Sequence, residues 1–431
     1  MVKIVIIGAG SGFGSTLSLD IMAREPMRDA CIGLCDINAE RLEATYQYVR
    51  FAIESHGLPA TVEKSTDREE MLPGADFVVT SVAVGGPAYS GPVYANEMKI
   101  PAKYGIDQSV GDTVGPAGVF RVLRTGPVQL GFCRDVDRLC PGALVLNYTN
   151  PMAMLTWIHS EGSGARNVGL CHSVQGTTRR MAEYAGVPYD EVSYWVAGIN
   201  HQAWVLEFLH KGEDAYPLVR RAMDDPEVCA KDAVRFEMMK HFGYFPTESS
   251  HHNSEYLPYF RRSDELFERF GLKRREVSEE PNYRHRWLDD SGSVNLPGEP
   301  PQLVASREYA SQIIQAEVTD EPFRFNGNVM NTGLITNLPE GCCVEVPCMA
   351  DGRGVHPCHV GELPPQCAAI NRSNVAVQEL AARAVLDRDR EAAFHAVALD
   401  PLTAAVLPLH RIREMFEEMW KANAAQLTYF D

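Results

Sequence analysis

The sequence has no apolar run long enough to cross a bilayer. The chain begins MVKIVIIGAG, in which one lysine precedes only a few apolar residues, too few for a signal peptide or a membrane span. The sequence also has no internal repeat and no low-complexity tract. These absences predict a globular protein without a membrane partner.

Basic residues are outnumbered. The chain has 40 Lys and Arg against 57 Asp and Glu, which gives a formal net charge of −17. A surface that binds nucleic acid needs clustered basic residues, and those of this chain are scattered. We therefore expect no nucleic-acid partner, and the acidic total says little about the substrate.

The cysteines have no regular spacing. They number eleven, which is odd, and this favours a reducing compartment over a disulfide framework. We therefore expect a cytoplasmic location. The adjacent pair Cys342 and Cys343 lies in the apolar stretch GCCVEVPC and is expected to belong to a buried strand rather than to a redox site.

The first third of the chain alternates short β-branched runs with helical patterns, which is typical of βαβ units and a parallel sheet. A helix is expected from about Ser15, and another is expected over residues 38–55 with Asn38 as its N-cap. Strands are expected at residues 2–7, 31–36, 75–84, 143–151 and 167–172. Because ligands bind at the carboxyl ends of such strands, polar residues that follow them are site candidates.

After about residue 200 the pattern is mixed. Helices are expected near residues 230–242 and 365–386, strands near 326–348, and a polar stretch covers 275–300. The predicted fold class is α/β: a Rossmann-type doubly wound parallel sheet followed by a mixed α+β domain, as in lactate and malate dehydrogenases. The length favours two domains, predicted as a nucleotide domain over residues 1–195 and an α+β domain for substrate, metal and oligomer contacts over residues 196–431.

A glycine-rich string follows the first predicted strand. IVIIGAGSGFGS supplies Gly8, Gly10, Gly12 and Gly14, close to the G-x-G-x-x-G pattern that brings a pyrophosphate to a helix N-terminus. Asp36 ends the second strand roughly twenty residues later, where a carboxylate accepts hydrogen bonds from a ribose. The string and the aspartate together predict NAD rather than NADP as cofactor.

Polar residues also follow the fourth and fifth predicted strands. Asn150 in NYTNP either orients a substrate hydroxyl or simply starts a turn. Cys171 and His172 end the fifth strand in LCHSVQGT, and His201 lies in AGINHQAW. A thiolate and an imidazole can share a divalent metal, but a buried cysteine and a hydrogen-bonded histidine explain the same residues. Spacing alone leaves both interpretations open.

These segments together resemble glycoside hydrolase family four. The resemblance is carried by GLCHSVQGT, AGINH, LNYTNPMA, SSHHNSEYLPYF, LPEGCCVEV and HAVALDPLTAAVL. Within the family the chain is most similar to the melibiase-type α-galactosidases. The resemblance implies a cytoplasmic glycosidase that uses NAD and Mn2+ or another divalent metal, acts on a small glycoside, and forms a homodimer or homotetramer.

The resemblance also implies the reaction. NAD takes a hydride from carbon 3 of an α-galactoside, a base removes the proton on carbon 2, and the metal stabilises the enolate while the glycosidic oxygen leaves carbon 1. Water then adds and the hydride returns, so that the net reaction is hydrolysis.

The family's site residues are carried over one by one. Cys171 and His201 match the metal ligands, and Asn150 matches the asparagine that contacts the substrate. His172 is expected to be the acid that assists the leaving group, because an imidazole pKa lies near neutrality. The alternative for His172 is a residue that orients Cys171 or a metal-bound water.

Tyr256 best matches the family's catalytic tyrosine, the expected base. A nearby metal or arginine would depress its pKa toward a working value. Tyr259 is the rival, and a buried aromatic ring is the structural alternative for either. The neighbours His251, His252 and Glu255 either contact sugar or metal or belong to a solvated loop.

Other substrates and another class of enzyme remain open. The segment IDQSVGDTVGPAG is more similar to the family's α-galacturonidases, and a uronate would need a cation such as Arg121, Arg124, Arg284 or Arg286. A malate-type 2-hydroxyacid dehydrogenase is the alternative of another class, because that fold has the same Asn-Pro arrangement at a strand end. CHSV disfavours phosphorylated glycosides.

Overall fold

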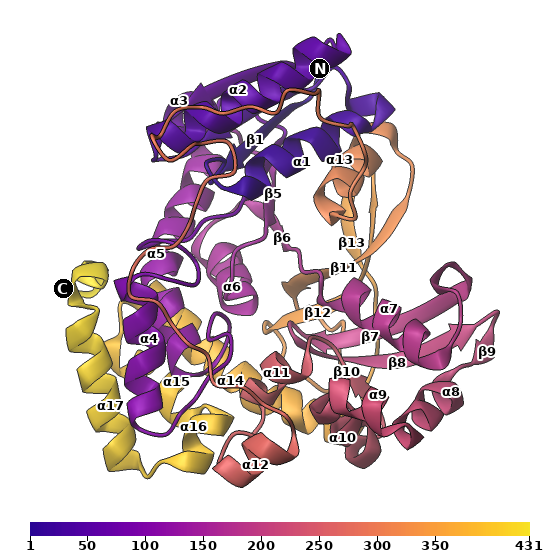
Figure 1. The fold of residues 1–431 in the computed structure, drawn as a ribbon, viewed down its shortest axis with the longest axis vertical. Coiled ribbons are helices and arrows are strands. Elements are labelled where there is room, and N and C mark those ends of the chain that lie inside the picture. The colour runs from indigo at the N-terminus through magenta and orange to yellow at the C-terminus, as the bar shows by residue number, and fades with distance from the viewer.

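One mixed sheet of 13 strands runs through the molecule, and helices pack around it (Figure 1). The computed structural model describes all 431 residues. The hydrogen-bonded strand order is β10-β8-β7-β12-β11-β6-β5-β4-β1-β2-β3, with β13 beside β12 and β9 beside β8. The sheet has a parallel amino-terminal part and an antiparallel remainder, which confirms the predicted α/β class with a mixed second part.

Six parallel strands form the amino-terminal part. They are β1 (Lys3–Ile7), β2 (Cys31–Cys35), β3 (Thr61–Ser65), β4 (Phe77–Thr80), β5 (Leu144–Asn147) and β6 (Arg166–Gly169). Their order, β3-β2-β1-β4-β5-β6, is that of a Rossmann sheet. The chain adds β2 and β3 on one side of β1 and then adds β4, β5 and β6 on the other side, so that the strand order reverses between β1 and β4. Ligands of such sheets bind in the crevice at this reversal.

The connecting helices are α1 (Gly12–Ala23), α2 (Ala39–His56), α3 (Arg68–Met71), α4 (Pro92–Lys103), α5 (Gly115–Leu139), α6 (Met152–Gly162) and α7 (Ser173–Ala185). The predicted cap of α2 is confirmed, because the Asn38 side chain accepts a hydrogen bond from the Arg41 N–H at 2.9 Å. Helix α1 begins before the predicted Ser15, directly at the glycine-rich turn. Helices α4 and α5 were not predicted.

Several predicted strands are too long at their carboxyl ends. Strand β4 stops at residue 80, β5 at 147 and β6 at 169, whereas the sequence predicted 84, 151 and 172. Residues that follow these strands line cavities instead of continuing the ladder. The polar residues that follow the strands therefore lie in loops.

Antiparallel strands extend the sheet. They are β7 (Val192–Ile199), β8 (Gln202–His210), β9 (Glu213–Asp214), β10 (Phe245–Pro246), β11 (Phe323–Met330), β12 (Cys343–Asp351) and β13 (Gly354–Pro357). Two junctions in the sheet consist of a single residue pair each. Asn328 of β11 pairs with Gly169 of β6, and Glu345 of β12 pairs with Gly198 of β7. As predicted, Cys342 and Cys343 are buried beside this ladder.

Ten helices complete the fold. They are α8 (Tyr216–Arg221), α9 (Pro226–Lys231), α10 (Ala233–Phe242), α11 (Ser250–Asn253), α12 (Asp264–Arg269), α13 (Tyr309–Thr319), α14 (Pro365–Asp387), α15 (Arg390–Leu399), α16 (Pro401–Val406) and α17 (Leu409–Ala422). Helix α14 packs against α5 and α6, and α17 lies beside α4 (Figure 1). The largest apolar core therefore includes both Ile4 and Leu427. None of the helices combines the length and apolar composition that crossing a bilayer requires.

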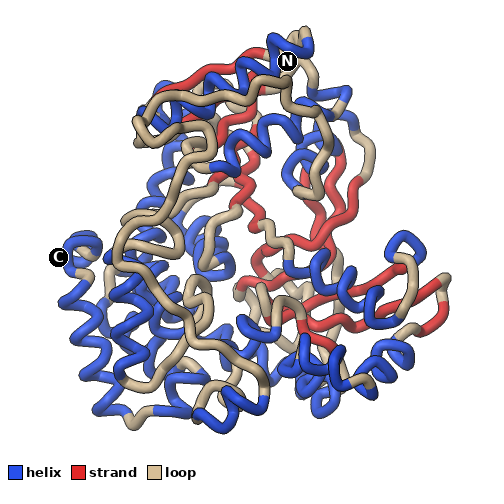
Figure 2. Tube along the Cα trace, viewed as in Figure 1, coloured by secondary structure: helices blue, strands red, loops and turns tan.

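Residues 273–308 link α12 to α13 without a helix or a named strand, and we call this segment the strap (Figure 2). It contains the polar stretch noted in the sequence. Trp287 anchors it on the Rossmann part by stacking on Tyr48 of α2, with ring centroids 3.9 Å apart. The strap ends at Glu308, directly before α13.

Candidate active site

The glycine-rich turn at the end of β1 excludes side chains at two positions. Gly8 has φ +91°, and a Cβ there would lie 2.0 Å from the Ser81 carbonyl oxygen. A Cβ on Gly14 would lie 2.4 Å from the Ala9 carbonyl oxygen, so this glycine allows α1 to pack closely on the turn. Gly12 differs, because no atom lies within 4 Å of its Cβ position. The first residue of α1 thus faces open space.

Asp36 closes the same turn. Its carboxylate accepts hydrogen bonds from the backbone N–H groups of Gly10 at 2.8 Å and Asn38 at 2.9 Å. A cavity of about 700 Å³ lies over the turn, and its lining includes Gly10, Asp36 and Arg41. Each carboxylate oxygen can accept a further hydrogen bond, and Asp36 lines this cavity. Space, glycines and carboxylate together fit a bound dinucleotide.

A second cavity, of about 590 Å³, lies at the carboxyl ends of β5 and β6, and it shares Ser81, Tyr148 and Asn150 with the first. Asn150 therefore lies where the two cavities meet. Its Nδ2 donates a hydrogen bond to Asp112 at 3.1 Å, while its Oδ1 is buried without a partner. A buried acceptor without a partner is costly, and a ligand hydroxyl at this junction would satisfy it.

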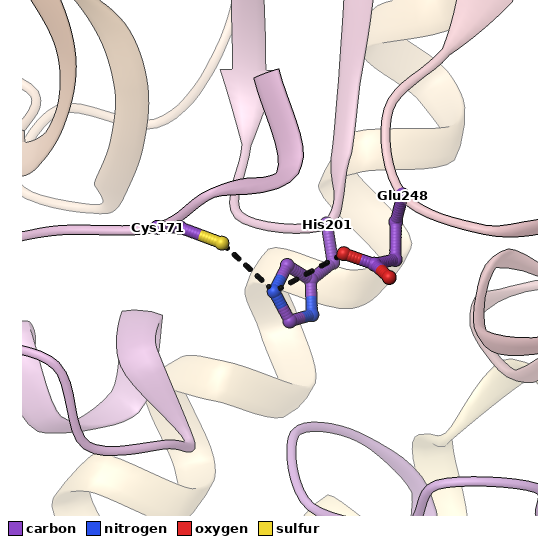
Figure 3. A group of neighbouring side chains, drawn as sticks. All are labelled: Cys171, His201 and Glu248. Atoms are coloured by element: carbon purple, nitrogen blue, oxygen red, sulfur yellow. Dashed lines mark hydrogen bonds and ion pairs between the residues drawn. The ribbon is translucent and has the colours of Figure 1, made fainter. Parts of the chain in front are cut away.

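Cys171, His201 and Glu248 form a cluster in the second cavity (Figure 3). The His201 Nε2 atom lies 3.1 Å from the Cys171 sulfur and 3.6 Å from a Glu248 oxygen. The three ligand atoms lie within 4.8 Å of one another. Sulfur, imidazole and carboxylate donors suit a divalent transition metal, and three protein ligands leave positions open for substrate. The residues present thus fit a metal ion.

Two members of the cluster have unusual backbones. His201 has φ 61° and Glu248 has φ 73°, in the left-handed region that non-glycine residues rarely occupy. His201 occupies the tight turn between β7 and β8, and Glu248 follows β10. Such conformations cost on the order of 1 kcal/mol each and tend to occur at functional sites. Sequence reasoning missed Glu248, since no spacing distinguishes it within TESSHHN.

The charges of the cluster are coupled. Burial disfavours the charged form of His201, but the Cys171 thiolate and the Glu248 carboxylate outweigh burial and raise the His201 pKa to about 10. Burial raises the Cys171 pKa, yet His201 brings it below its ordinary value overall. The cluster thus favours the Cys171 thiolate, which is the form that binds a metal, whereas His201 must release its proton to become a ligand.

A buried chain of side chains supports His201 from behind. The His201 Nδ1 atom lies 2.9 Å from the His252 Nε2 atom, and the His252 Nδ1 atom is bonded to the Glu255 carboxylate. Glu255 also accepts a hydrogen bond from the Val110 N–H at 2.9 Å. His252 and Glu255 are almost fully buried, so the solvated-loop interpretation is wrong for both. The His251 side chain takes no part in this chain.

Asp112 connects this chain to Asn150 and was not predicted. It accepts hydrogen bonds from the Tyr89 hydroxyl at 2.8 Å and from Asn150. Burial opposes its ionisation, but the positive charges of His252 and Arg121 nearby hold its pKa below the usual range. Asp112 is therefore a fixed negative charge between the two cavities.

His172 lines the second cavity and is 58% exposed. Its Nε2 atom lies 2.6 Å from a Glu308 carboxylate oxygen at the end of the strap. This hydrogen bond raises the pKa of His172 against the opposing effect of burial. The ring stacks on Tyr148, with centroids 5.9 Å apart. The imidazole is thus oriented and favoured in its protonated form.

Tyr256 is fully buried, and its hydroxyl has no hydrogen-bond partner. The ring meets His252 edge to face at 5.5 Å. Burial, together with the carboxylates of Asp112 and Glu248, raises its pKa well above the ordinary value. A cation bound at the neighbouring cluster would oppose this shift and lower the Tyr256 pKa. Tyr259 is 44% exposed and lines a separate surface groove.

The arginines considered for a uronate substrate are engaged elsewhere. Arg124 forms a buried two-pronged ion pair with a glutamate, and Arg121 binds a backbone carbonyl and faces Asp112. Arg284 is 86% exposed in the strap, and Arg286 packs over Trp287. None of these four lines the second cavity. Arg121 and Arg124 line the first cavity instead.

The fold and the site define a class. The Rossmann sheet holds a nucleotide-type crevice, and a cluster of potential metal ligands lies in the cavity that adjoins it. A family model described as "Family 4 glycosyl hydrolase" matches residues 3–187, and one described as "Family 4 glycosyl hydrolase C-terminal domain" matches residues 196–403. The chain belongs to family 4 of the glycosyl hydrolases, which confirms the resemblance and makes it a glycosidase rather than a dehydrogenase.

Known proteins similar to the chain fall in the same family. An "Alpha-galactosidase" of Bacillus subtilis (strain 168) is 40% identical, with 98% of each chain covered. An "Alpha-galactosidase" of Rhizobium meliloti (strain 1021) is 35% identical, covering 99% of this chain and 89% of the relative. A solved 6-phospho-alpha-glucosidase from gut microorganisms, in complex with NAD and Mn2+, has a TM-score of 0.76 at 19% identity and covers 99% of this chain and 98% of its own. That structural likeness supports the fold.

Proposed function

We propose that the chain hydrolyses α-galactosides with NAD and a divalent metal ion, preferably Mn2+. The observation that carries the proposal is the junction at Asn150, where the cavity over the glycine-rich turn meets the cavity with the metal cluster. A sugar in the second cavity would contact both the dinucleotide and the metal ion. The α-galactosidase relatives, and the NAD and Mn2+ of a protein with the same fold, support the choice of substrate and cofactors.

Different residues of the chain bind the dinucleotide, the metal ion and the sugar. The glycine-rich turn and Asp36 hold the dinucleotide, and Cys171, His201 and Glu248 hold the metal ion. When bound, NAD accepts and returns a hydride and the divalent ion supplies positive charge beside the sugar oxygens. Asn150 orients the sugar, because its Oδ1 lacks a partner and accepts a hydrogen bond from a hydroxyl.

Two further residues handle protons. His172 donates a proton to the departing glycosidic oxygen, and Glu308 holds its ring in place and favours its charged form. Tyr256 removes the proton from the sugar ring. Its hydroxyl is committed to no other group, and the ring packs on His252 beside the cluster.

The charge of the second cavity supports a neutral sugar. Its two arginines are Arg180 and Arg235, and Arg235 is bonded through both prongs to Asp232. Arg180 pairs with Glu183 on the surface of α7. No unpaired buried cation thus awaits a carboxylate, which favours galactoside over galacturonide. The α-galacturonidase alternative rests on the segment 106–118.

Three further expectations from the sequence are part of this proposal. The division of the chain at residue 195, a homodimer or homotetramer, and a cytoplasmic location follow from the sequence and the family. A reducing compartment suits the cluster, because Cys171 binds a metal only as a thiolate.

Hydrolysis of p-nitrophenyl α-galactoside and of its galacturonide tests the proposal, with NAD and Mn2+ each withheld in turn and a thiol present. Cleavage of the galactoside that needs both cofactors, without net NADH, is the expected result. Preference for the galacturonide would identify an α-galacturonide, in place of an α-galactoside, as the substrate. Cleavage that is indifferent to NAD would overturn the proposal.

A further inference from the structure

The strap reaches the cavity over the glycine-rich turn and is fixed on both sides of the residue that lines it. On one side, the Asn282 N–H donates to the Ser90 hydroxyl at 3.1 Å, in the loop that follows β4. On the other side, His285 lies 3.2 Å from the Thr45 hydroxyl of α2. Tyr283 lies between these two anchors and lines the cavity. Its position is therefore set by contacts that precede and follow it.

The Tyr283 hydroxyl meets the glycine-rich turn directly. The Gly12 N–H, at the start of α1, donates a hydrogen bond to this hydroxyl at 3.0 Å, which is the hydroxyl's one hydrogen bond within the chain. The neighbouring N–H groups of Gly10 and Ser11 are already used, by Asp36 and by the Gly8 carbonyl. A dinucleotide phosphate that approaches the Gly12 N–H therefore comes close to the phenol.

We propose that Tyr283 is a cofactor-positioning residue, whose hydroxyl accepts the Gly12 N–H and donates its own proton to a pyrophosphate oxygen of the dinucleotide. The inference rests on the proposed use of NAD. It assigns part of the nucleotide site to a residue some 270 positions beyond the glycine-rich turn. The strap thus completes the cofactor site instead of merely linking α12 to α13.

The surroundings of Tyr283 suit a donor. A phenol has one proton to donate, and the Gly12 contact uses only its oxygen as an acceptor. Burial raises the Tyr283 pKa above its ordinary value, so the hydroxyl keeps its proton at neutral pH. The Arg41 guanidinium lies 4.6 Å from the ring centroid, which adds positive charge where a pyrophosphate would bind. An anionic ligand is therefore favoured at this point of the cavity.

Calorimetric titration of the wild-type protein and of Tyr283→Phe with ADP, adenosine and NAD tests the inference. ADP carries a pyrophosphate and adenosine does not. The variant should bind ADP and NAD about tenfold or more weakly, as expected for loss of a hydrogen bond to a charged group, and should bind adenosine with unchanged affinity. Tyr429→Phe, which removes a hydroxyl near the carboxyl terminus, is the control and should match the wild type.

Four results would overturn the inference. Unchanged ADP affinity would mean that the hydroxyl does not touch the pyrophosphate, and tighter ADP binding would mean that it competes for the Gly12 N–H. Equal weakening for ADP and adenosine would assign Tyr283 to the ordering of the strap alone. If the wild-type protein binds neither NAD nor ADP, the proposed cofactor fails and this inference fails with it. The variant retains the ring and its Arg41 contact, so we expect it to fold like the wild type. An unchanged Tm verifies this.

Discussion

The Nδ1 atom of His201 lies 2.9 Å from the Nε2 atom of His252. This contact occupies one nitrogen of the His201 ring and thereby turns the other toward Cys171 and Glu248. The Glu255 carboxylate holds His252 in the same way. A buried histidine pair thus orients the proposed metal ligand.

His252→Gln should therefore weaken Mn2+ binding by about 10- to 100-fold, the usual effect of losing a group that orients a ligand histidine. Competition with a fluorescent chelator measures the affinity. His210→Gln, which alters a partly exposed histidine on β8, is the control. An unchanged Mn2+ affinity in the His252 variant would show that His201 needs no support.

Cys171→Ser should abolish most Mn2+ binding and most activity, by more than about 100-fold, because a serine hydroxyl does not ionise at neutral pH as the thiol does. Metal affinity and hydrolysis of the nitrophenyl galactoside are the measurements. Cys229→Ser changes a half-buried cysteine on α9 and should retain both. Full turnover of the Cys171 variant in the presence of a chelator would exclude the cluster as a metal site.

Tyr256→Phe should remove activity without loss of stability. The hydroxyl is buried and has no hydrogen-bond partner, so its removal leaves no group unsatisfied and should change the free energy of unfolding by less than about 0.5 kcal/mol. Thermal unfolding and exchange of the proton on carbon 2 test the two halves. Tyr259→Phe is the control, and normal exchange in the Tyr256 variant would assign the base elsewhere.

Asp400 makes stability depend on pH. Burial raises its pKa from 3.8 to about 6, although Thr403 hydrogen bonds oppose the shift. The folded state therefore binds this proton more tightly than the unfolded state, and stability falls as pH rises from about 4 to 6 and stays lower above. The elevation corresponds to roughly 3 kcal/mol.

Asp400→Asn removes this titration and keeps a residue that caps helices well. The gain in Tm over the wild type should be larger at pH 8 than at pH 5, as differential scanning fluorimetry can measure. A gain of the same size at both pH values would show that Asp400 ionises normally in the folded protein.

The sequence predicted the Rossmann part well because its signals are local. The glycines from Gly8 to Gly14, the Asn38 cap and the presence of strands directly before Asn150 and Cys171 each follow from a few adjacent residues, although β5 and β6 end earlier than predicted. The family resemblance then placed Cys171 and His201 in one site, and the structure brings them within 3.1 Å.

The parts that the sequence did not predict depend on distant segments. Glu248 reaches the cluster through a left-handed backbone conformation that no sequence pattern marks. Asp112 and Glu308 meet Asn150 and His172 only after long loops fold back. The sequence could not place the candidate arginines for a uronate, because pairing with an internal carboxylate, as for Arg124, depends on the fold.

The proposed mechanism proceeds by transient oxidation and elimination, and the hydrogen on carbon 2 of the product reports on these steps most directly. The nitrophenyl α-galactoside is hydrolysed in D2O with NAD and Mn2+, and the released galactose is analysed by NMR. Deuterium is expected at carbon 2, because the proton removed there is replaced from solvent. Galactose that keeps its original hydrogen at carbon 2 would indicate direct displacement at carbon 1 and would exclude oxidation and elimination.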